Sequence, residues 1–325
     1  MPEAIVIHEF GKSDVMALED IELAEPKAGE IRIRQTAIGV NFHDIYVRSG
    51  LYHTLVPPGI LGCEAVGIIE GIGDGVQGVE TGERVAYVTG PPYGAYASHR
   101  NLRALAAVPV PSNLNDKTVA ANLLRSLTVD MLTKRVTRLE PGMTILVHAA
   151  AGGVGRLLCQ MASHMGATVI GTVGSSEKSE IATSCGCKHP ILYRQTDFAA
   201  AVSEITDGKG VDVVYDSIGA DTFAGSFAAA SKCGHLVNFG QSSGPVAPVT
   251  MSKLAEKSLT VSRPILFHYL EDSDTYHDMA SSVFEAVAKK VLQFDSPQIF
   301  TLADAGEAHD LLASGAAVKS LVLTT

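Results

Sequence analysis

The pattern of hydrophobic and polar positions changes about a third of the way along this chain of 325 residues. Before that point, short apolar runs alternate with Gly- and Pro-rich segments such as "GIGDGVQG" and "TGPPYG", a pattern typical of strands joined by turns. Helical spacing is limited to a turn around residues 42–48. The first 120 or so residues therefore predict a β-rich domain, with strands over residues 4–7, 30–37, 65–70 and 84–88.

Further along, helical spacing begins at about residue 116, and strands then alternate with helices. One helix is expected over residues 116–138, and the letters "EPG" that follow end it. The expected strands cover residues 145–148, 168–173, 191–193, 211–216, 235–239 and 259–262, and the expected helices cover 154–165, 176–184, 198–206 and 222–230. Strands separated by helices of this length are typical of parallel βαβ units, so this region predicts an α/β domain with a doubly wound parallel sheet.

The last segment predicts two amphipathic helices, over residues 278–292 and 302–313, and a terminal strand over 320–323. We expect this segment to pack back onto the β-rich domain. A chain of 325 residues is long for one hydrophobic core, which favours two domains. The expected boundaries are residues 1–124 together with 263–325 for the β-rich domain, and 125–262 for the doubly wound domain.

Composition and charge narrow the classes of function. Hydrophobic residues make up 46% of the chain and charged residues 18%, which is typical of a well-packed globular protein. The net charge of −10 disfavours binding to nucleic acid, because phosphate contacts dominate such binding. No apolar run reaches the length of a membrane span, and residues 1–10 show no signal peptide, so a cytoplasmic protein is expected.

The cysteine pattern agrees with a reducing compartment. The chain has five cysteines, an odd number, and no C-x-x-C spacing, which argues against both a disulfide framework and a structural zinc site. We interpret Cys185 and Cys187 as an incidental pair, with a redox pair as the less favoured alternative.

The stretch "VHAAAGGVG", residues 147–155, is a candidate dinucleotide-binding turn between a strand and a helix. Ala150 stands at the first glycine position of G-x-G-x-x-G, while Gly152 and Gly155 keep the second and third. The second glycine lets a pyrophosphate approach the backbone and the third lets the helix pack on its strand, so the two positions that matter most are retained. A small-residue turn packed against a neighbour is the alternative, and the βαβ context favours the nucleotide site.

The end of the next strand indicates which nicotinamide cofactor is bound. An Asp or Glu there would hold the ribose hydroxyls of NADH, but the sequence has Gly174 and Ser175, with Lys178 one helical turn further on. A hydroxyl, backbone N–H groups and an ammonium group suit a 2′-phosphate, so NADPH is expected. Glu177 is expected to face solvent, and an ordinary surface lysine is the alternative interpretation of Lys178.

Several motifs taken together resemble a known family. "HAAAGGVG", "GTVGSSEK", "VYDSIGADT", "FGQSSG" and "GVNFHDIYVRSGLY", with "GCEAVG", "GERV" and "GAYASH", are similar to motifs of the NADPH-dependent quinone oxidoreductases. These are the zinc-free, zeta-crystallin-like branch of the medium-chain dehydrogenase/reductases, and the resemblance covers essentially the whole chain. It implies a GroES-like domain formed by both chain ends, a Rossmann domain between them, NADPH as the cofactor and a homodimer.

The resemblance also implies residue roles. Asn41 and Tyr46 would face the nicotinamide and the substrate, with Phe42, His43 and Asp44 around them. Tyr52 is expected to add an aromatic wall for a flat ring, the alternative being a loop aromatic that covers the core. The implied cofactor-binding residues are Asn41, Phe42, Tyr46, Thr128, Gly152, Gly153, Val154, Gly174, Ser175, Lys178, Tyr193, Ser217, Phe239, Gly240, Ser242, Ser243 and Arg263. The chain departs from relatives at Asp130, where Tyr is frequent, and at Gly315, where Arg is frequent.

No metal is expected at the site. Zinc-using relatives have Cys and His at the positions of Asn41 and Cys63, and catalytic zinc needs about three protein ligands. Glu64 is expected to be structural, with a catalytic role as the less favoured alternative. His43 and Asp44 are expected to be structural or adjacent to the cofactor. Quinone reduction suits such a site because the quinone ring is already electron-poor and needs no strong Lewis acid.

The leading hypothesis is therefore an NADPH:quinone oxidoreductase, in which the electron count and the physiological quinone stay open. The alternatives are an NADPH-dependent alkenal or enone reductase and, from another class, a non-catalytic NADPH-binding sensor or RNA-binding protein.

Overall fold

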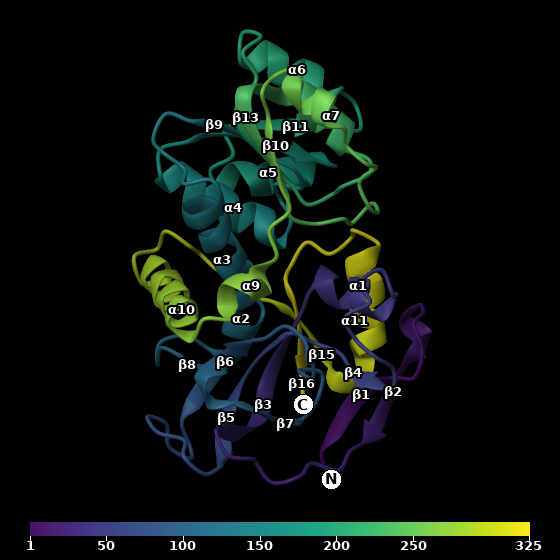
Figure 1. Cartoon of the computed structure of the whole chain (residues 1–325), viewed down its shortest axis with the longest axis vertical. Coiled ribbons are helices and arrows are strands. Elements are labelled where there is room, and N and C mark those ends of the chain that lie inside the picture. The colour runs from purple at the N-terminus through teal and green to yellow at the C-terminus, as the bar shows by residue number, and fades with distance from the viewer. The chain divides into compact units, whose positions relative to one another are not determined.

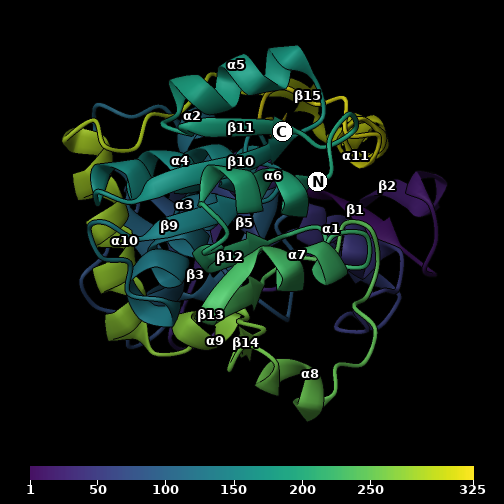
Figure 2. The ribbon, with the colours of Figure 1, turned by 90° about the horizontal axis from the view of Figure 1, so that it is seen from above.

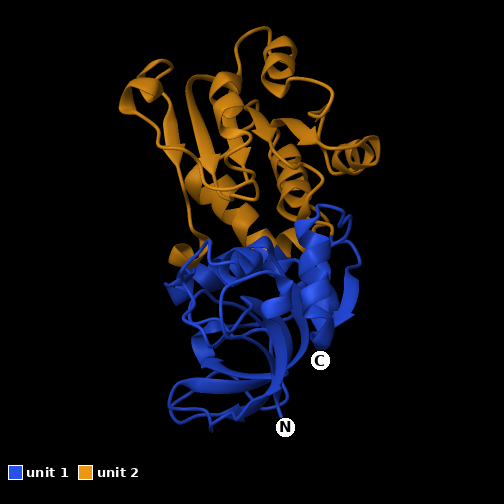
Figure 3. Ribbon diagram, turned by 90° about the vertical axis from the view of Figure 1, so that its right-hand side faces the viewer, with its two compact units in different colours: residues 1–124, 270–284, 294–325 blue, residues 125–269, 285–293 orange.

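The computed structural model describes all residues from Met1 to Thr325 and divides into two compact units (Figure 3). Unit 1 comprises Met1–Leu124, Leu270–Phe284 and Phe294–Thr325, and unit 2 comprises Arg125–Tyr269 and Glu285–Gln293. The sequence boundaries had assigned residues 263–269 and 285–293 to the β-rich domain, whereas the structure groups both with unit 2. The grouping of residues 285–293 with unit 2 agrees with a hydrogen bond to α4, in which the Gln293 backbone N–H donates to Gln160 Oε1 at 2.9 Å.

Unit 1 contains two β-sheets (Figure 1). The smaller has the order β2-β1-β4, formed by β1 (Glu3–Ile7), β2 (Met16–Asp20) and β4 (Gly59–Ile60). The larger has the order β15-β16-β3-β5-β6-β8, and β7 also pairs with β3. Its strands are β3 (Glu30–Val40), β5 (Glu64–Ile72), β6 (Arg84–Val88), β7 (His99–Arg103), β8 (Ala107–Pro109), β15 (Gln298–Thr301) and β16 (Leu321–Thr324).

The long strand β3 brings the first candidate residues to the end of this sheet. Ile31, Ile33 and Ala37 are fully buried and alternate with more exposed residues, which is the period of two expected for a strand with one face in the core. β16 from the carboxyl end of the chain pairs antiparallel with β3, with Leu323 opposite Ile38. Both chain ends therefore form this unit, as the resemblance implied. Helix α1 (Phe42–Arg48) begins two residues after β3 and contacts α11 (Ala305–Ala313).

Unit 2 is built on one parallel sheet of six strands with the order β11-β10-β9-β12-β13-β14. These strands are β9 (Thr144–Val147), β10 (Thr168–Val173), β11 (His189–Leu192), β12 (Val211–Asp216), β13 (Ala230–Asn238) and β14 (Thr260–Ser262). The main helices are α4 (Gly153–His164), α5 (Ser176–Ser184), α6 (Phe198–Ile205) and α7 (Phe223–Ala229). α4 packs with α5 against β9 and β10, and α6 packs with α7 against β11, β12 and β13 (Figure 2). The prediction of a doubly wound parallel sheet is confirmed.

The single helix expected over residues 116–138 is wrong. The structure has α2 (Asp116–Ala120), α3 (Leu123–Asp130) and then a π-helical segment, Met131–Val136. Threonine side chains explain the irregular end, because the Thr137 hydroxyl donates to the Leu132 carbonyl at 2.8 Å and the Thr133 hydroxyl to the Val129 carbonyl at 2.8 Å. Such bonds compete with the regular helical ladder.

The remaining α-helices are α8 (Met251–Ala255), α9 (Leu266–Leu270) and α10 (Ser273–Ala288). Short 3-10 helices cover Ser13–Val15, Ala104–Ala106 and Leu302–Asp304. None of the helices combines the length and the apolar character needed to cross a membrane.

Candidate active site

Asn41 is the N-cap of α1 and is held on two sides. Its backbone N–H donates to Asp44 Oδ2 at 2.8 Å, in a capping box that satisfies the first turn of the helix. Its side-chain Nδ2 donates to Glu64 Oε1 at 2.7 Å, and Glu64 Oε2 accepts the Leu124 N–H at 2.7 Å. With Glu64 only 1% exposed, its carboxylate orients Asn41 and the start of α3. The capping box engages the Asn41 side-chain oxygen with the Asp44 N–H, so the second Nδ2 hydrogen is what this amide has left for a ligand.

Aromatic rings gather beside Asn41. The Tyr46 and Tyr52 ring centroids lie 4.9 Å apart, and the Phe42 ring lies 6.0 Å from that of Tyr46. The ring centroid of His43 lies 5.6 Å from the ring centroids of both Tyr52 and Tyr93, and its Nε2 is 2.9 Å from the Tyr93 hydroxyl oxygen. Burial lowers the pKa of His43 to about 4, so this imidazole is neutral at physiological pH. The structure thus places Tyr52 against Tyr46, in a surface that suits a flat ring.

Asp44 and Cys63 have structural partners. Asp44 is 1% exposed and accepts hydrogen bonds from Asn41 N, the Tyr96 hydroxyl at 3.2 Å and Cys63 Sγ at 3.4 Å. Burial, followed by the charge of Asp44, raises the pKa of the fully buried Cys63 thiol well above its usual range. No group of three or more His, Cys, Asp or Glu side chains is spaced to hold a metal ion.

In unit 2, the glycine turn has the close approaches that its sequence implied. A Cβ on Gly155 would lie 2.1 Å from the Ala149 carbonyl oxygen, so only glycine lets α4 pack this tightly on the turn after β9. Gly152 is the N-cap and offers no side-chain cap, which leaves the first N–H groups of the twelve-residue helix α4 to a ligand. This uncapped, positive helix end fits the diphosphate of a dinucleotide.

Arg125 was not foreseen at this turn. A Cβ on Gly153 would lie 2.8 Å from Arg125 Nε, so the guanidinium group covers the start of α4. Arg125 is 6% exposed and lies on α3 three residues before Thr128, which is 8% exposed, so the two share one face of that helix. A signal was available in the sequence, because Arg125 precedes the predicted cofactor residue Thr128 by one helical turn.

The second βα corner brings together the residues expected around a 2′-phosphate. Ser175 is the N-cap of α5, and its hydroxyl accepts the Lys178 N–H at 3.3 Å. A Cβ on Gly174 would lie 3.4 Å from the Tyr193 hydroxyl and 3.7 Å from Arg194 Nε. No carboxylate stands at Gly174 or Ser175, directly after β10, and Glu177 in the first turn of α5 is exposed, as the sequence analysis expected. Arg194, which the sequence reasoning missed, adds a cation beside Gly174. The corner fits an anionic group on the adenosine ribose.

The remaining expected cofactor residues follow β12, β13 and β14 at the same carboxyl edge of the sheet. The Ser242 N–H donates to the Ser217 carbonyl at 3.3 Å, and a Cβ on Gly240 would lie 2.6 Å from that carbonyl oxygen. The Phe239 N–H donates to the Asp216 carbonyl at 2.9 Å, and the Ser243 hydroxyl to the Ile218 carbonyl at 2.9 Å. Arg263 donates to the Asn238 carbonyl at 3.0 Å.

A buried polar cluster beneath this edge was not foreseen. Asp216 is fully buried and accepts the N–H groups of Ile218 and Gly219 at 2.9 and 3.0 Å, the Thr222 hydroxyl, and the Ser226 hydroxyl at 3.1 Å. His148 follows β9, with Nε2 at 3.0 Å from the Ser226 hydroxyl. Burial lowers the pKa of His148 to about 4 against the smaller opposing effect of Asp216. The cluster links the ends of β9 and β12 beneath the expected cofactor edge.

Asp130 and Gly315, the two positions at which the chain departs from its relatives, have different surroundings in the structure. Asp130 forms an ion pair with Lys134 at 2.5 Å, one turn along the same helical segment, and its side chain is only 3% exposed. Its charge is therefore matched within unit 2. Gly315 has φ +69° in the turn after α11, and a Cβ there would meet nothing within 4 Å.

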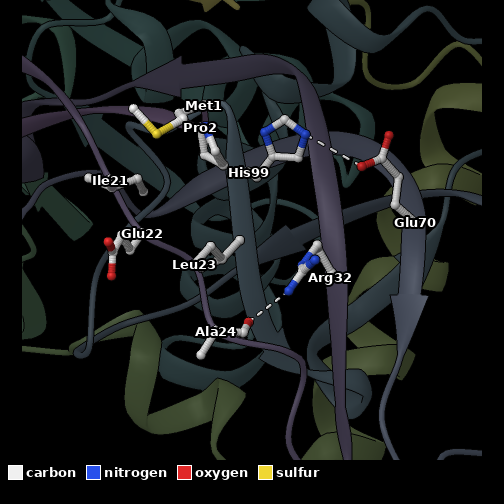
Figure 4. A pocket seen from close by; sticks show the side chains of 9 residues that line it. All are labelled: Met1, Pro2, Ile21, Glu22, Leu23, Ala24, Arg32, Glu70 and His99. Carbon is white, nitrogen blue, oxygen red and sulfur yellow. Dashed lines mark hydrogen bonds and ion pairs between the residues drawn. The ribbon is translucent and has the colours of Figure 1, made fainter.

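A separate pocket in unit 1 contains none of the expected site residues (Figure 4). Three of its polar and charged side chains have partners within the unit, since Arg32 donates to the Ala24 carbonyl at 2.7 Å and His99 lies 3.4 Å from Glu70. The expected site residues thus lie in two separate regions, one around Asn41 in unit 1 and one at the carboxyl edge of the sheet in unit 2.

Comparison with known proteins identifies a family for both parts of the chain. Residues 27–112 match the family described as "Alcohol dehydrogenase GroES-like domain", and residues 153–286 match the one described as "Zinc-binding dehydrogenase". A "Quinone oxidoreductase" of Pseudomonas aeruginosa is 40% identical over 99% of both chains. The chain belongs to the quinone oxidoreductase family of the medium-chain dehydrogenase/reductases. The resemblance identified from the sequence motifs is confirmed.

Two other members of the family bear on chemistry. A "2-haloacrylate reductase" of a Burkholderia species is also 40% identical over 99% of both chains. The crystal structure of the Escherichia coli quinone oxidoreductase complexed with NADPH has a TM-score of 0.96 and 38% identity, and the match covers 99% of this chain and 100% of that chain. The names of these relatives therefore indicate two kinds of electron acceptor, a quinone and a haloacrylate.

Proposed function

We propose that this protein is an NADPH:quinone oxidoreductase, which reduces a quinone by hydride or single-electron transfer without a metal. The observation that carries the cofactor assignment is the corner after β10. There Gly174, Ser175 and Lys178 gather N–H, hydroxyl and ammonium groups where an acid would select NADH. The full-length relatives named quinone oxidoreductases support the choice of acceptor.

The chain's own residues have separate tasks in this proposal. NADPH supplies the reducing equivalents when it is bound. The uncapped start of α4 would hold its diphosphate, and Lys178 with Ser175 would hold its 2′-phosphate. The rings of Tyr46 and Tyr52 would bind the flat quinone, and the second Nδ2 hydrogen of Asn41 would donate to the oxygen on which negative charge develops. Neutral His43 would supply no proton at physiological pH.

A second candidate function is the NADPH-dependent reduction of an activated carbon–carbon double bond, as in an alkenal or enone. The relative named 2-haloacrylate reductase favours it, since its identity to this chain equals that of the P. aeruginosa quinone oxidoreductase. Both reactions place an electron-poor carbon framework against the nicotinamide. They differ in the acceptor. Quinone reduction requires a site for a flat six-membered ring, whereas alkenal or enone reduction requires a site for a short chain with a polar group.

Steady-state kinetics with NADPH will separate the two. We expect turnover of 1,4-naphthoquinone and 9,10-phenanthrenequinone, with weaker turnover of 2-chloroacrylate and an open-chain enone. A preference for 2-chloroacrylate or the enone would establish the second candidate. Binding of NADPH without turnover of any acceptor would contradict both enzymatic functions and return the non-catalytic NADPH-binding protein to consideration.

The assembly and the compartment are also proposals. We propose a cytoplasmic homodimer. The compartment is supported by the cysteines, all five of which are free. The homodimer is supported by β14, which forms one edge of the parallel sheet with only β13 beside it and so can pair with another chain. Light scattering after size-exclusion chromatography should give twice the mass of the 34.1 kDa chain.

A further inference from the structure

Four buried side chains of unit 1 form one hydrogen-bonded chain that ends at the N-cap of α1. Arg48 lies 3.1 Å from His309 Nδ1, and His309 Nε2 lies 2.8 Å from the Tyr96 hydroxyl. That hydroxyl donates to Asp44 Oδ2 at 3.2 Å, and the same oxygen accepts the backbone N–H of Asn41. Tyr96 and His309 are fully buried, Asp44 is 1% exposed and Arg48 is 6% exposed.

The direction of each hydrogen bond follows from the chemistry of the groups. Arginine has only donors, so His309 Nδ1 must accept. The single proton of the neutral imidazole is then on Nε2, which donates to the Tyr96 oxygen, and the Tyr96 proton is left for Asp44. All three bonds therefore point toward Asp44. Burial and the neighbouring Arg48 lower the pKa of His309 to about 3, in agreement with a neutral imidazole.

The chain closes a ring around a short helix. Asp44 and Arg48 are four residues apart on α1, which is only seven residues long, while His309 comes from α11 and Tyr96 from the segment before β7. An isolated helix of this length is unstable in water, so its position depends on tertiary contacts. The ring joins the first and last turns of α1 to two segments distant in sequence.

We propose that Arg48, His309, Tyr96 and Asp44 are positioning residues that hold Asn41 and Tyr46 in the orientation needed for reduction of the acceptor. This inference rests on the proposed function, because it assigns Asn41 and Tyr46 to the reacting site. Asn41 is held through its backbone by Asp44 and through its amide by Glu64, so the N-cap has two supports. Release of one support lets α1 shift relative to the rest of unit 1, and small displacements of donor groups slow a reaction strongly.

Tyr96→Phe with Tyr276→Phe as its control tests the proposal. Each substitution removes one buried hydroxyl from unit 1, since Tyr276 is 2% exposed and accepts the Val88 N–H at 3.0 Å. We expect Tyr96→Phe to lower kcat for the acceptor about tenfold, below the roughly hundredfold that a 1 Å misplacement can cause. The KM for NADPH should stay unchanged. Tyr276→Phe should leave kcat per folded molecule unchanged.

A conservative pair at His309 provides the rescue. The amide of His309→Gln has an acceptor oxygen for Arg48 and a donor nitrogen for Tyr96, whereas His309→Leu has neither. We expect the Gln variant to keep kcat within about threefold of the unaltered protein, and the Leu variant to match Tyr96→Phe. Equal kcat losses in the Gln and Leu variants would overturn the proposal.

Hydrogen–deuterium exchange gives a readout that needs no substrate. The Asn41 backbone N–H should exchange faster in Tyr96→Phe and His309→Leu than in Tyr276→Phe, because only the first two disturb its acceptor Asp44. Failure of the proposed function would appear as an inactive unaltered protein in which this exchange difference persists. An active protein in which Tyr96→Phe and Tyr276→Phe have the same kcat and the same exchange would overturn the positioning role alone.

Discussion

Each unit contains a buried carboxylate beside its part of the candidate site, and the two carboxylates are satisfied in different ways. Asp216 of unit 2 receives its hydrogen bonds from Ile218, Gly219, Thr222 and Ser226, all within ten residues along the chain. Asp44 of unit 1 receives two of its bonds from Cys63 and Tyr96, which are 19 and 52 residues away. The hydrogen bonds that Asp216 accepts are therefore local in sequence, whereas Asp44 depends partly on long-range partners.

The two units also differ in how support and ligand binding are shared among residues. In unit 2, the expected 2′-phosphate residues Ser175 and Tyr193 are exposed and lie outside the buried Asp216 cluster. In unit 1, Asn41 is both a candidate reacting residue and a bonded neighbour of the buried carboxylates. Stability and function should therefore be separable by mutation in unit 2 and coupled in unit 1.

The largest expected effect is on the local network. Asp216→Ala leaves the buried Gly219 N–H and the part-buried Ile218 N–H without their acceptor, and we expect a loss of roughly 4 kcal/mol in the free energy of unfolding. Urea unfolding followed by circular dichroism measures it. Asp212→Ala is the matched control on the same strand, because exposed Asp212 accepts only the Thr144 N–H. Similar losses in the two variants would show that the Asp216 cluster gives unit 2 no special support.

Acid should destabilise both units through their buried neutral histidines. The pKa values of His148 and His309 fall from 6.5 to about 4 and about 3 on folding, so below pH 6.5 the unfolded chain binds protons that the folded chain does not. Stability is then lost as the pH falls, and at pH 5 each histidine accounts for about 2 kcal/mol. Urea unfolding at pH 7.5 and pH 5 measures this loss.

Replacing each histidine by glutamine shows how much of the loss of stability at low pH comes from each unit. His148→Gln and His309→Gln should each reduce the difference in stability between pH 7.5 and pH 5, because the new side chain does not titrate. The contributions should be similar in size even though Asp216 faces His148 and Arg48 faces His309, since burial is the largest cause of both shifts. A pH dependence unchanged in both variants would contradict this origin.

The fold was predictable where burial repeats with a regular period. The alternation along β3 and the strand–helix alternation of unit 2 gave the two architectures correctly. β2 and β15 were missed because neither has a fully buried residue, so no alternation marks them. The break between α2 and α3 was missed because the Leu124 N–H is taken by Glu64, a partner 60 residues away.

The candidate site was predictable where a role demands a particular residue at a short spacing. Gly155 is required by a contact with Ala149 six residues earlier, so the motif alone reveals it. Arg194 adjoins the expected Tyr193, and its charge at a strand end was a signal that went unused. His309 and Tyr96 reach Asp44 only through the tertiary structure. His309 lies 213 residues from Tyr96, and Tyr96 lies 52 residues from Asp44, so no local pattern marks them.

The smallest expected effect is that of a substitution at Lys178. It tests most directly whether ligand binding and stability are separable in unit 2. Lys178→Ala removes a cation from the corner after β10, and we expect KM for NADPH to rise about tenfold, or about 1.4 kcal/mol, with KM for NADH nearly unchanged. Steady-state kinetics with each cofactor measures this. The free energy of unfolding should change by less than about 0.5 kcal/mol, because the side chain lies outside the buried network.

Arg194→Ala is the companion variant for this prediction, because Arg194 lies beside the same Gly174. If both cations face the 2′-phosphate, the double variant should lose most of its preference for NADPH while its urea midpoint stays close to that of the unaltered protein. Equal losses with NADPH and NADH would place Lys178 away from the 2′-phosphate. A large fall in stability would show instead that binding and support share residues in unit 2 as they do around Asn41 in unit 1, and the contrast between the two units would be lost.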